Sequence, residues 1–193
     1  MNLGGHYFMM GNIHLESDNL IIRSSVFDDC QYFDEWERKD YIREFFTMEV
    51  TRDYEEIVRE FVLNEVDNTK FQMTIIFKET CEPIGRIYIT GYDENLKSLD
   101  ITRIYIGEEE YLGKGYGKES MILLLGFIFE DLEIERASLD TFEGHEKGVR
   151  LFGDLGFVEE GVMRHSTRKH GRFYDLYLKS MLSHEYFELY GKK

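Results

Sequence analysis

Three glycines stand at alternate positions in the stretch YLGKGYGKES, residues 111–120, directly before an apolar run, MILLLGFIF. The glycines are Gly113, Gly115 and Gly117, and the lysines beside them are Lys114 and Lys118. A helix that begins here has N–H groups without internal partners, and its dipole adds roughly half a positive charge at that end. Because glycine has no side chain to block a ligand, the stretch predicts a cradle for an anion such as a diphosphate. The alternative is a glycine-rich connection that holds no ligand.

Two nucleotide-binding patterns do not match this loop. The P-loop pattern G-x-x-x-x-G-K-[ST] fails at Leu112 and Glu119, and the dinucleotide pattern G-x-G-x-x-G fails at Lys118. The six histidines show no metal-ligand spacing, and no G-x-S-x-G motif is present. The sequence therefore predicts neither a metal site nor a serine triad.

Strand and helix patterns alternate around the loop. Strands are expected at 20–27, 71–79, 83–92, 96–107, 136–142, 157–168 and 172–182. Helices are expected at 29–38, 54–66, 117–132 and 144–157, with a short helix near the end of the chain. This order favours an α/β (α+β) fold with a mixed, mostly antiparallel sheet flanked by helices.

The strand before the loop changes phase. Leu99 and Ile101 share one parity, whereas Ile104 and Ile106 share the other. A strand that faces one core keeps its alternation, so a bulge between Ile101 and Ile104 is expected. A twist at the end of the strand is the alternative.

Composition limits the classes of function. The 193 residues fit one domain, 1–193, with an N-terminal extension of about 15 residues. The net charge of −15 disfavours nucleic acid and suits a cationic partner such as an amine, or only serves solubility. Cys30 and Cys81 are expected to be reduced thiols. With no basic signal segment and no long apolar run, we expect a cytoplasmic protein without a membrane span.

The motifs together resemble the GNAT superfamily of acetyl-CoA-dependent N-acetyltransferases, over about residues 20–186. Leu112 to Gly117 resembles its diphosphate loop, [QR]-x-x-G-x-[GA], with Leu112 in place of Gln or Arg. The stretch GHEKGVRLFGDLGFVEEGVMR is similar to its N-x-x-A-x-x-x-Y-x-x-x-G-F segment, and KHGRFYDLYLKSML to its closing hairpin. The nearest subgroup is that of the spermidine and ribosomal-protein N-terminal acetyltransferases.

The resemblance implies a GNAT-like sheet of six to seven strands, splayed between the fourth and fifth. Acetyl-CoA would enter the gap between SLDITRIYIG and RASLDTF. Backbone groups near Tyr105 and Ile106 would pair with the pantetheine arm. The loop would hold the diphosphate through Leu112, Gly113, Lys114, Gly115, Tyr116, Gly117 and Lys118.

Acetyl transfer also needs a base, an oxyanion donor and a leaving thiolate. Asp100 is the first candidate for the base or the ammonium ligand, and Asp140 is the second. A backbone N–H near Ile106 is the candidate oxyanion donor.

Two positions depart from the family pattern. Phe152 stands where the family has its tyrosine acid and has no proton to give, and His145 stands in place of the asparagine. His145 either donates a hydrogen bond to CoA or is a surface residue. Tyr174 and Tyr177 are core or interface residues, and one of them could replace the missing acid.

The expected activity is transfer of acetyl to a primary amine (a polyamine, an aminosugar or a protein N-terminus) by direct attack in a ternary complex. The rivals are a CoA-binding sensor without turnover and a purely structural domain. His165 and His170 lie in a basic patch, RHSTRKHGR, expected as an exposed turn or as a contact for the 3′-phosphate of CoA. The aromatic ends GGHYFMMG and EYFELYG suggest a homodimer.

Overall fold

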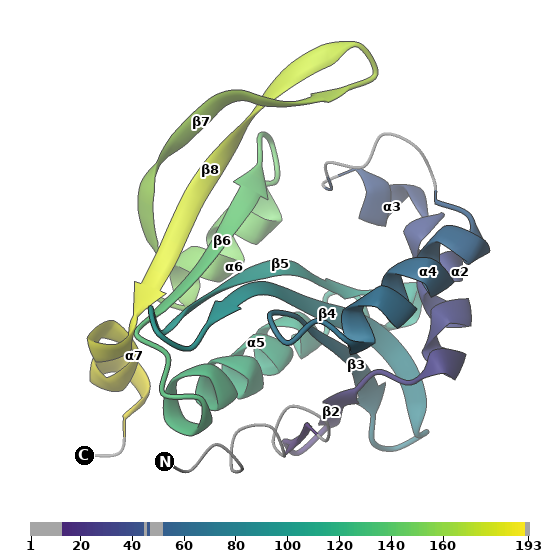
Figure 1. Cartoon of the computed structure of the whole chain (residues 1–193), viewed down its shortest axis with the longest axis horizontal. Helices are drawn as coiled ribbons and strands as arrows, with labels where there is room; N and C mark the ends of the chain where they lie inside the picture. The colour runs from purple at the N-terminus through teal and green to yellow at the C-terminus, as the bar shows by residue number, and fades with distance from the viewer. Residues whose placement is uncertain (1–12, 45, 47–51, 192–193) are drawn as a thin grey trace.

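Eight strands form one sheet in the computed structural model, which describes residues 13–44, 46 and 52–191 (Figure 1). The strand order is β1-β2-β3-β4-β5-β6-β8-β7. The strands are β1 (His14–Glu16), β2 (Leu20–Ser24), β3 (Phe71–Phe77), β4 (Glu82–Asp93), β5 (Ser98–Ile106), β6 (Arg136–Phe142), β7 (Val158–Lys169) and β8 (Arg172–Leu182). Every neighbouring pair is antiparallel except β5–β6, which is parallel.

The parallel pair separates soon after it begins. Its register covers only Ser98↔Arg136, Leu99↔Ala137 and Asp100↔Ser138. Beyond Asp100, β5 keeps β4 on one side but has no strand on the other, so the two strands diverge in a V (Figure 1). This is the splay expected between the strands at 96–107 and 136–142, which are the fourth and fifth when β1 is not counted.

Helices cover the two faces of the sheet separately. They are α2 (Cys30–Glu37), α3 (Asp40–Arg43), α4 (Tyr54–Glu65), α5 (Tyr116–Gly126), α6 (Glu146–Asp154) and α7 (Ser183–Tyr190). One apolar core joins α5, α6 and α7 to the sheet and includes Ile106 of β5. A smaller core joins α2, α3 and α4 to the other face through Tyr105, the neighbour of Ile106. Short η1 (Phe27–Asp29), η2 (Glu109–Tyr111) and the π-helical η3 (Phe127–Asp131) complete the chain.

A bulge in β5 confirms the expected change of phase. Tyr88 of β4 pairs with Arg103 and Ile89 pairs with Ile101, which leaves Thr102 as the extra residue. In a regular strand, Asp100 and Tyr105 are five positions apart and would point to opposite faces. The bulge places both side chains on the face that α2–α4 partly cover.

The sheet has eight strands, whereas six to seven were expected, and the structure contains two elements that the sequence did not predict. The eighth strand is β1, only three residues long, at the end of the stretch expected to be an N-terminal extension; residues 1–12 of that stretch lie outside the described residues. The four-residue helix α3 was also not anticipated. Both are too short for periodicity to reveal.

Local signals placed the remaining elements well. α4 starts at a capping box in which Asp53 accepts from the N–H of Glu56 at 2.9 Å. The β7–β8 turn sits at KHG, where His170 and Gly171 have φ of 49° and 78°. Among the helices described, none is long and apolar enough to cross a membrane.

Candidate functional site

The glycine loop ends at the N-terminus of α5. Gly113 and Gly115 have φ of 73° and 90°, a region that other residues seldom adopt. A Cβ placed on Gly113, Gly115 or Gly117 would meet nothing within 4 Å, so the loop opens to solvent. Gly115 is the N-cap and supplies no side-chain cap, which leaves the first N–H groups of α5 for a ligand. These features fit an anion such as a diphosphate.

Contacts from distant segments fix the start of α5. Glu119 in the first turn accepts from the Ser17 hydroxyl at 2.6 Å and from the Asn19 side chain at 3.1 Å, both in the β1–β2 turn. The rings of Tyr111 and Tyr116 pack on Phe77 at 5.0 and 5.3 Å between centroids. The loop is therefore free to meet a ligand, whereas the helix behind it is held.

The loop side chains remain outside this support. Lys118 and Leu112 are exposed, and the Lys114 ammonium lies 5.4 Å from the centre of the Tyr111 ring. Lys114 and Lys118 thus add positive charge beside the open backbone.

Tyr105 and Ile106 lie on the diverging arm of β5. Their backbones pair with Arg86 and Gly85 of β4 on one side, and no strand pairs with them on the other. The Tyr105 hydroxyl donates to Glu37 at 3.4 Å, so this side chain points toward α2 and only the backbone can face the gap. Ile106 is buried in the α5 core.

Asp100 is the last residue of β5 that pairs with β6, and we call this point, where the two strands begin to diverge, the apex of the V. One carboxylate oxygen accepts from the Thr102 hydroxyl and the other from the Ser138 hydroxyl, each at 3.0 Å. Burial raises the pKa of Asp100, although both hydroxyl donors oppose that shift.

Asp140 lies two residues after Ser138 on β6, on the same face as Asp100. Its pKa is raised by loss of water around the carboxyl and then by the charge of Asp100. No salt bridge within the described part of the chain involves either aspartate. The two acids therefore form a negative site at the apex that protein cations do not neutralise.

Phe152 and His145 lie on α6. Phe152 is buried in the α5 core and its ring packs on Phe157 at 5.8 Å. His145 is the N-cap, and a Cβ on Gly148 would come within 2.6 Å of its Nδ1, so the ring lies over the first turn. Burial lowers the pKa of His145, which favours the neutral imidazole.

The last hairpin holds the remaining sequence candidates. Tyr174 packs on Phe142 at 4.7 Å, and Tyr177 pairs with Thr141 across the strands. The hairpin tip, with His165 stacked on Phe173 at 5.4 Å, projects away from α5 (Figure 1). This placement favours the exposed-turn interpretation of the basic patch over a contact with the 3′-phosphate of CoA.

An ion cluster between the sheet and α2–α4 escaped the sequence analysis. Arg86 of β4 is fully buried and donates to Glu37 at 2.7 Å and to Glu60 at 3.0 Å. Arg52 also pairs with both glutamates, and Arg103 of β5 donates to Glu60 at 3.2 Å. The cluster ties β5, just beyond the bulge, to two helices. We call Glu37, Arg52, Glu60, Arg86 and Arg103 the arginine cluster.

No group of three or more metal-binding side chains occurs among the residues that the structure describes. The exposed thiol is Cys81, and Cys30 is buried. Burial raises the pKa of Cys30 to about 11, which keeps this thiol protonated.

Comparisons with known proteins agree with this geometry. The family model for the acetyltransferase (GNAT) domain matches residues 19–158. An uncharacterized N-acetyltransferase, p20 of Bacillus licheniformis, is 27% identical over 178 residues, which cover 89% of this chain and 97% of that protein. A prophage-derived uncharacterized N-acetyltransferase of Bacillus subtilis, YokL, is 25% identical over 158 residues, covering 82% and 86% of the two chains.

Solved structures show the same fold. A spermidine N-acetyltransferase from Vibrio cholerae, crystallised with CoA and spermine, superposes with a TM-score of 0.82. The match covers 89% of this chain and 99% of that one, at 20% sequence identity. At this identity the likeness shows a shared fold, the mixed sheet flanked by helices that the sequence predicted.

Proposed function

We propose, from the premise that this chain belongs to the GNAT acetyltransferase family, that it transfers an acetyl group from acetyl-CoA to a primary amine. One observation carries the proposal. The uncompensated acids Asp100 and Asp140 lie at the apex of a strand gap, and the arm of that gap leads to an open glycine cradle. An anionic cosubstrate would bind at the glycine cradle and a cationic acceptor at the two aspartates, both along the same gap.

The residues present suit acetyl-CoA. The N–H groups from Gly113 to Lys118 would hold its diphosphate, and Lys114 and Lys118 would add charge. The unpaired edge of β5 beyond Asp100 would accept the pantetheine arm as a partner in place of a strand. When bound, acetyl-CoA supplies an activated thioester and a thiolate leaving group.

Asp100 and Asp140 would have different roles toward the amine. Asp100 already accepts from two hydroxyls, so it stays in place and attracts the ammonium. Asp140 accepts no hydrogen bond among the described residues, and its raised pKa suits proton transfer. We therefore assign the base to Asp140 and the ammonium anchor to Asp100.

Stabilisation of the oxyanion and departure of the thiolate would depend less on side chains than deprotonation of the amine does. A backbone N–H near Ile106 on the unpaired edge of β5 would donate to the developing oxyanion. Phe152 cannot protonate the thiolate, but a thiol with a pKa near ~8.5 leaves without strong acid help. Tyr174 and Tyr177 stay candidates for a weak donor.

A CoA sensor without turnover is the second candidate. It is favoured by Phe152, which lies in the apolar core at the position where the family has its acid. Cytoplasmic location and a homodimer stay predictions. Phe187 and Leu189 of α7 expose apolar surface that a second copy could cover, whereas GGHYFMMG lies outside the described residues.

Thiol release from acetyl-CoA tests the enzyme against the sensor. The panel of acceptors contains a polyamine, an aminosugar and a peptide with a free N-terminus. We expect release with at least one amine and an acetylated product by mass spectrometry. A CoA-dependent rise in melting temperature without release from any amine would instead support the sensor.

Gly115→Asp tests the cradle separately. The new carboxylate repels the diphosphate, and the backbone φ of 90° at position 115 is strained for a residue with a side chain. We therefore expect the affinity for CoA to fall by about tenfold or more. Gly115→Ala is the control, since it keeps the strain without the charge. Unchanged affinity of Gly115→Asp for CoA in calorimetry would remove the loop from the proposal.

A further inference from the structure

The outer face of α4, up to its C-cap Val66, carries a row of apolar side chains. Val62, Leu63 and Val66 expose 52%, 60% and 79% of their surfaces, whereas Ile57 and Phe61 of the same helix are buried in the smaller core. The spacing of the three exposed residues places them on one side of the helix, opposite to the buried pair. The helix therefore has two apolar sides, and only one of them packs in the core. We call Val62, Leu63 and Val66 the α4 stripe.

A hollow of about 990 Å³ adjoins the C-terminal end of α4. Val26 and Phe27, which come just before α2, line this hollow and are about half exposed. The Phe27 ring packs edge-on against that of Phe61 with 6.3 Å between centroids, so the apolar lining of the hollow continues onto α4. A ridge beside a hollow on one surface is a shape that lets two identical surfaces interlock.

Charged side chains lie at both ends of the stripe. Arg59 precedes it by about one turn and forms no salt bridge with any residue that the structure describes. Asp67 directly follows the stripe; its carboxylate accepts from Thr69 and pairs with Lys70 at 2.9 Å, which fixes its position. A third of the Asp67 side chain is still exposed, and a carboxylate has acceptor sites for a further donor.

The order of these groups is complementary to its own reverse. When a two-fold axis passes beside Leu63, two α4 helices pack antiparallel, and positions equally distant from Leu63 in opposite directions face each other. Arg59 then lies opposite Asp67 of the second copy, and the symmetry makes this contact twice. Parallel packing would instead place Arg59 against Arg59, so the charges favour the antiparallel arrangement.

A second copy suits this surface better than a membrane or a nucleic acid does. Beside the stripe, α4 carries Glu55, Glu56 and Glu65, and the whole chain has a net charge of −15. These charges repel anionic lipids and phosphates. In the antiparallel arrangement, by contrast, no acid of α4 falls opposite another acid.

We propose that α4 forms the contact surface of a symmetric homodimer, in which the α4 stripe of one copy packs against the stripe and the adjoining hollow of the other. Burial of the apolar side chains supplies the affinity, and the two pairs of Arg59 with Asp67 set the antiparallel order. The inference does not depend on the proposed function, because the strand gap and the glycine cradle lie on other elements.

Analytical ultracentrifugation of the full chain tests this interface. We expect the parent to have the mass of a dimer, twice 23.0 kDa, or of an assembly of dimers. Leu63→Glu places two carboxylates beside the axis of each dimer, so it should raise the dissociation constant at least about 100-fold.

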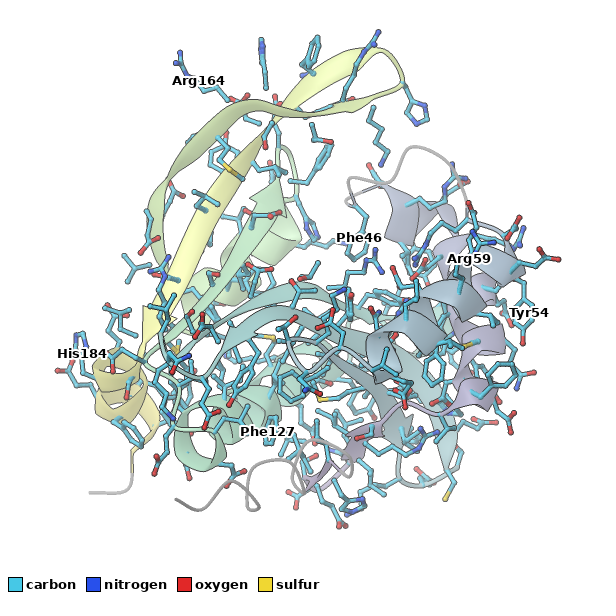
Figure 2. All side chains as sticks on the ribbon, in the orientation of Figure 1. Phe46, Tyr54, Arg59, Phe127, Arg164 and His184 are labelled. Atoms are coloured by element: carbon cyan, nitrogen blue, oxygen red, sulfur yellow. The ribbon has the colours of Figure 1, made fainter. Side chains whose placement is uncertain are left out.

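Leu189→Glu on α7 is the matched control. Leu189 is 59% exposed against 60% for Leu63, and it belongs to the other apolar surface that a second copy could cover. Figure 2 shows Arg59 of α4 and His184 of α7 at opposite ends of the molecule, so the two substitutions act on separate surfaces. A monomeric parent, or dissociation by Leu189→Glu but not by Leu63→Glu, overturns the proposal.

Arg59→Glu and Asp67→Lys keep the proposal testable if Leu63→Glu fails to fold. Each of them alone brings like charges together twice in its own dimer, so each should raise the dissociation constant about tenfold or more. An equal mixture of the two variants should recover dimers, because the introduced glutamate faces the introduced lysine and native Arg59 faces native Asp67. A mixture that stays as dissociated as its components, with both variants folded by circular dichroism, overturns the antiparallel pairing on which the proposal stands.

Discussion

Two pairs of acids lie on one face of the sheet in opposite surroundings. Glu37 and Glu60 pair with three arginines, whereas Asp100 accepts from two hydroxyls and Asp140 has the charge of Asp100 nearby. Burial alone would raise the pKa of Glu60, but Arg103, Arg86 and Arg52 lower it to about 2. Burial raises the pKa of the half-buried Asp100, loss of water around the carboxyl and the charge of Asp100 raise the pKa of Asp140, and no cation reverses either shift.

This contrast separates acids that stabilise the fold from acids that are available to bind a ligand. Paired carboxylates whose charge the protein neutralises hold elements together and have little left to offer a ligand. Carboxylates whose charge the protein leaves unmatched favour a cation from outside. The arginine cluster thus fixes β5 against α2 and α4, and the aspartates at the apex are available for an ammonium.

The largest effect should come from breaking the arginine cluster. Arg86→Met removes the fully buried partner of Glu37, which is itself 2% exposed and keeps Arg52 as a partner, so we expect a loss in the free energy of unfolding toward the lower end of the about 3–5 kcal/mol that breaking a buried ion pair costs. Urea denaturation measures it. The control is Arg136→Met, which breaks a half-exposed pair with Glu160 and should cost at most about 1 kcal/mol. Similar losses in both variants would contradict a special role for the cluster.

The next effect concerns the unmatched acids. Asp140→Asn removes the assigned base, and kcat/KM for the amine should fall by about 100-fold or more, measured by thiol release. Asp154→Asn, at the exposed end of α6, should leave it unchanged. Parent-like turnover in Asp140→Asn would move the base elsewhere, first to Asp100.

The same variant should be slightly more stable at neutral pH. The pKa of Asp140 is raised in the fold, so its contribution to stability is present below its unfolded pKa and is lost as pH rises through the raised value. Asparagine does not ionise and avoids this loss. A gain in melting temperature together with a loss of turnover would mark Asp140 as functional.

The smallest effect is the acid response of Glu60. Its pKa is lowered, so its contribution is present above the unfolded value near 4.5 and is lost as pH falls toward about 2. Glu60→Gln should therefore flatten the pH dependence of the unfolding free energy between pH 5 and 2. Equal slopes for variant and parent in urea melts at several pH values would refute the pairing.

Local signals made part of this structure predictable. The loop–helix junction follows from glycines beside an apolar run, and the bulge follows from the parity of Leu99 and Ile104. The splay came from a family resemblance, because no local pattern shows where two strands diverge.

Contacts between distant segments were not predictable. Arg86 stands at a polar position of the alternating strand PIGRIYITGY, which by itself indicates exposure. It is buried because Glu37 and Glu60, from two helices far away in the chain, cover it. Lys169 was part of an expected exposed patch and is buried instead, since its partners are backbone oxygens that composition cannot reveal.

A crystal structure with CoA and a bound, unreacted amine tests the central claim most directly. We predict the diphosphate on the N–H groups of Gly113 to Lys118, and the amine nitrogen within hydrogen-bond distance of Asp100 and Asp140. An amine bound at the arginine cluster, or a diphosphate held away from the start of α5, would contradict the account.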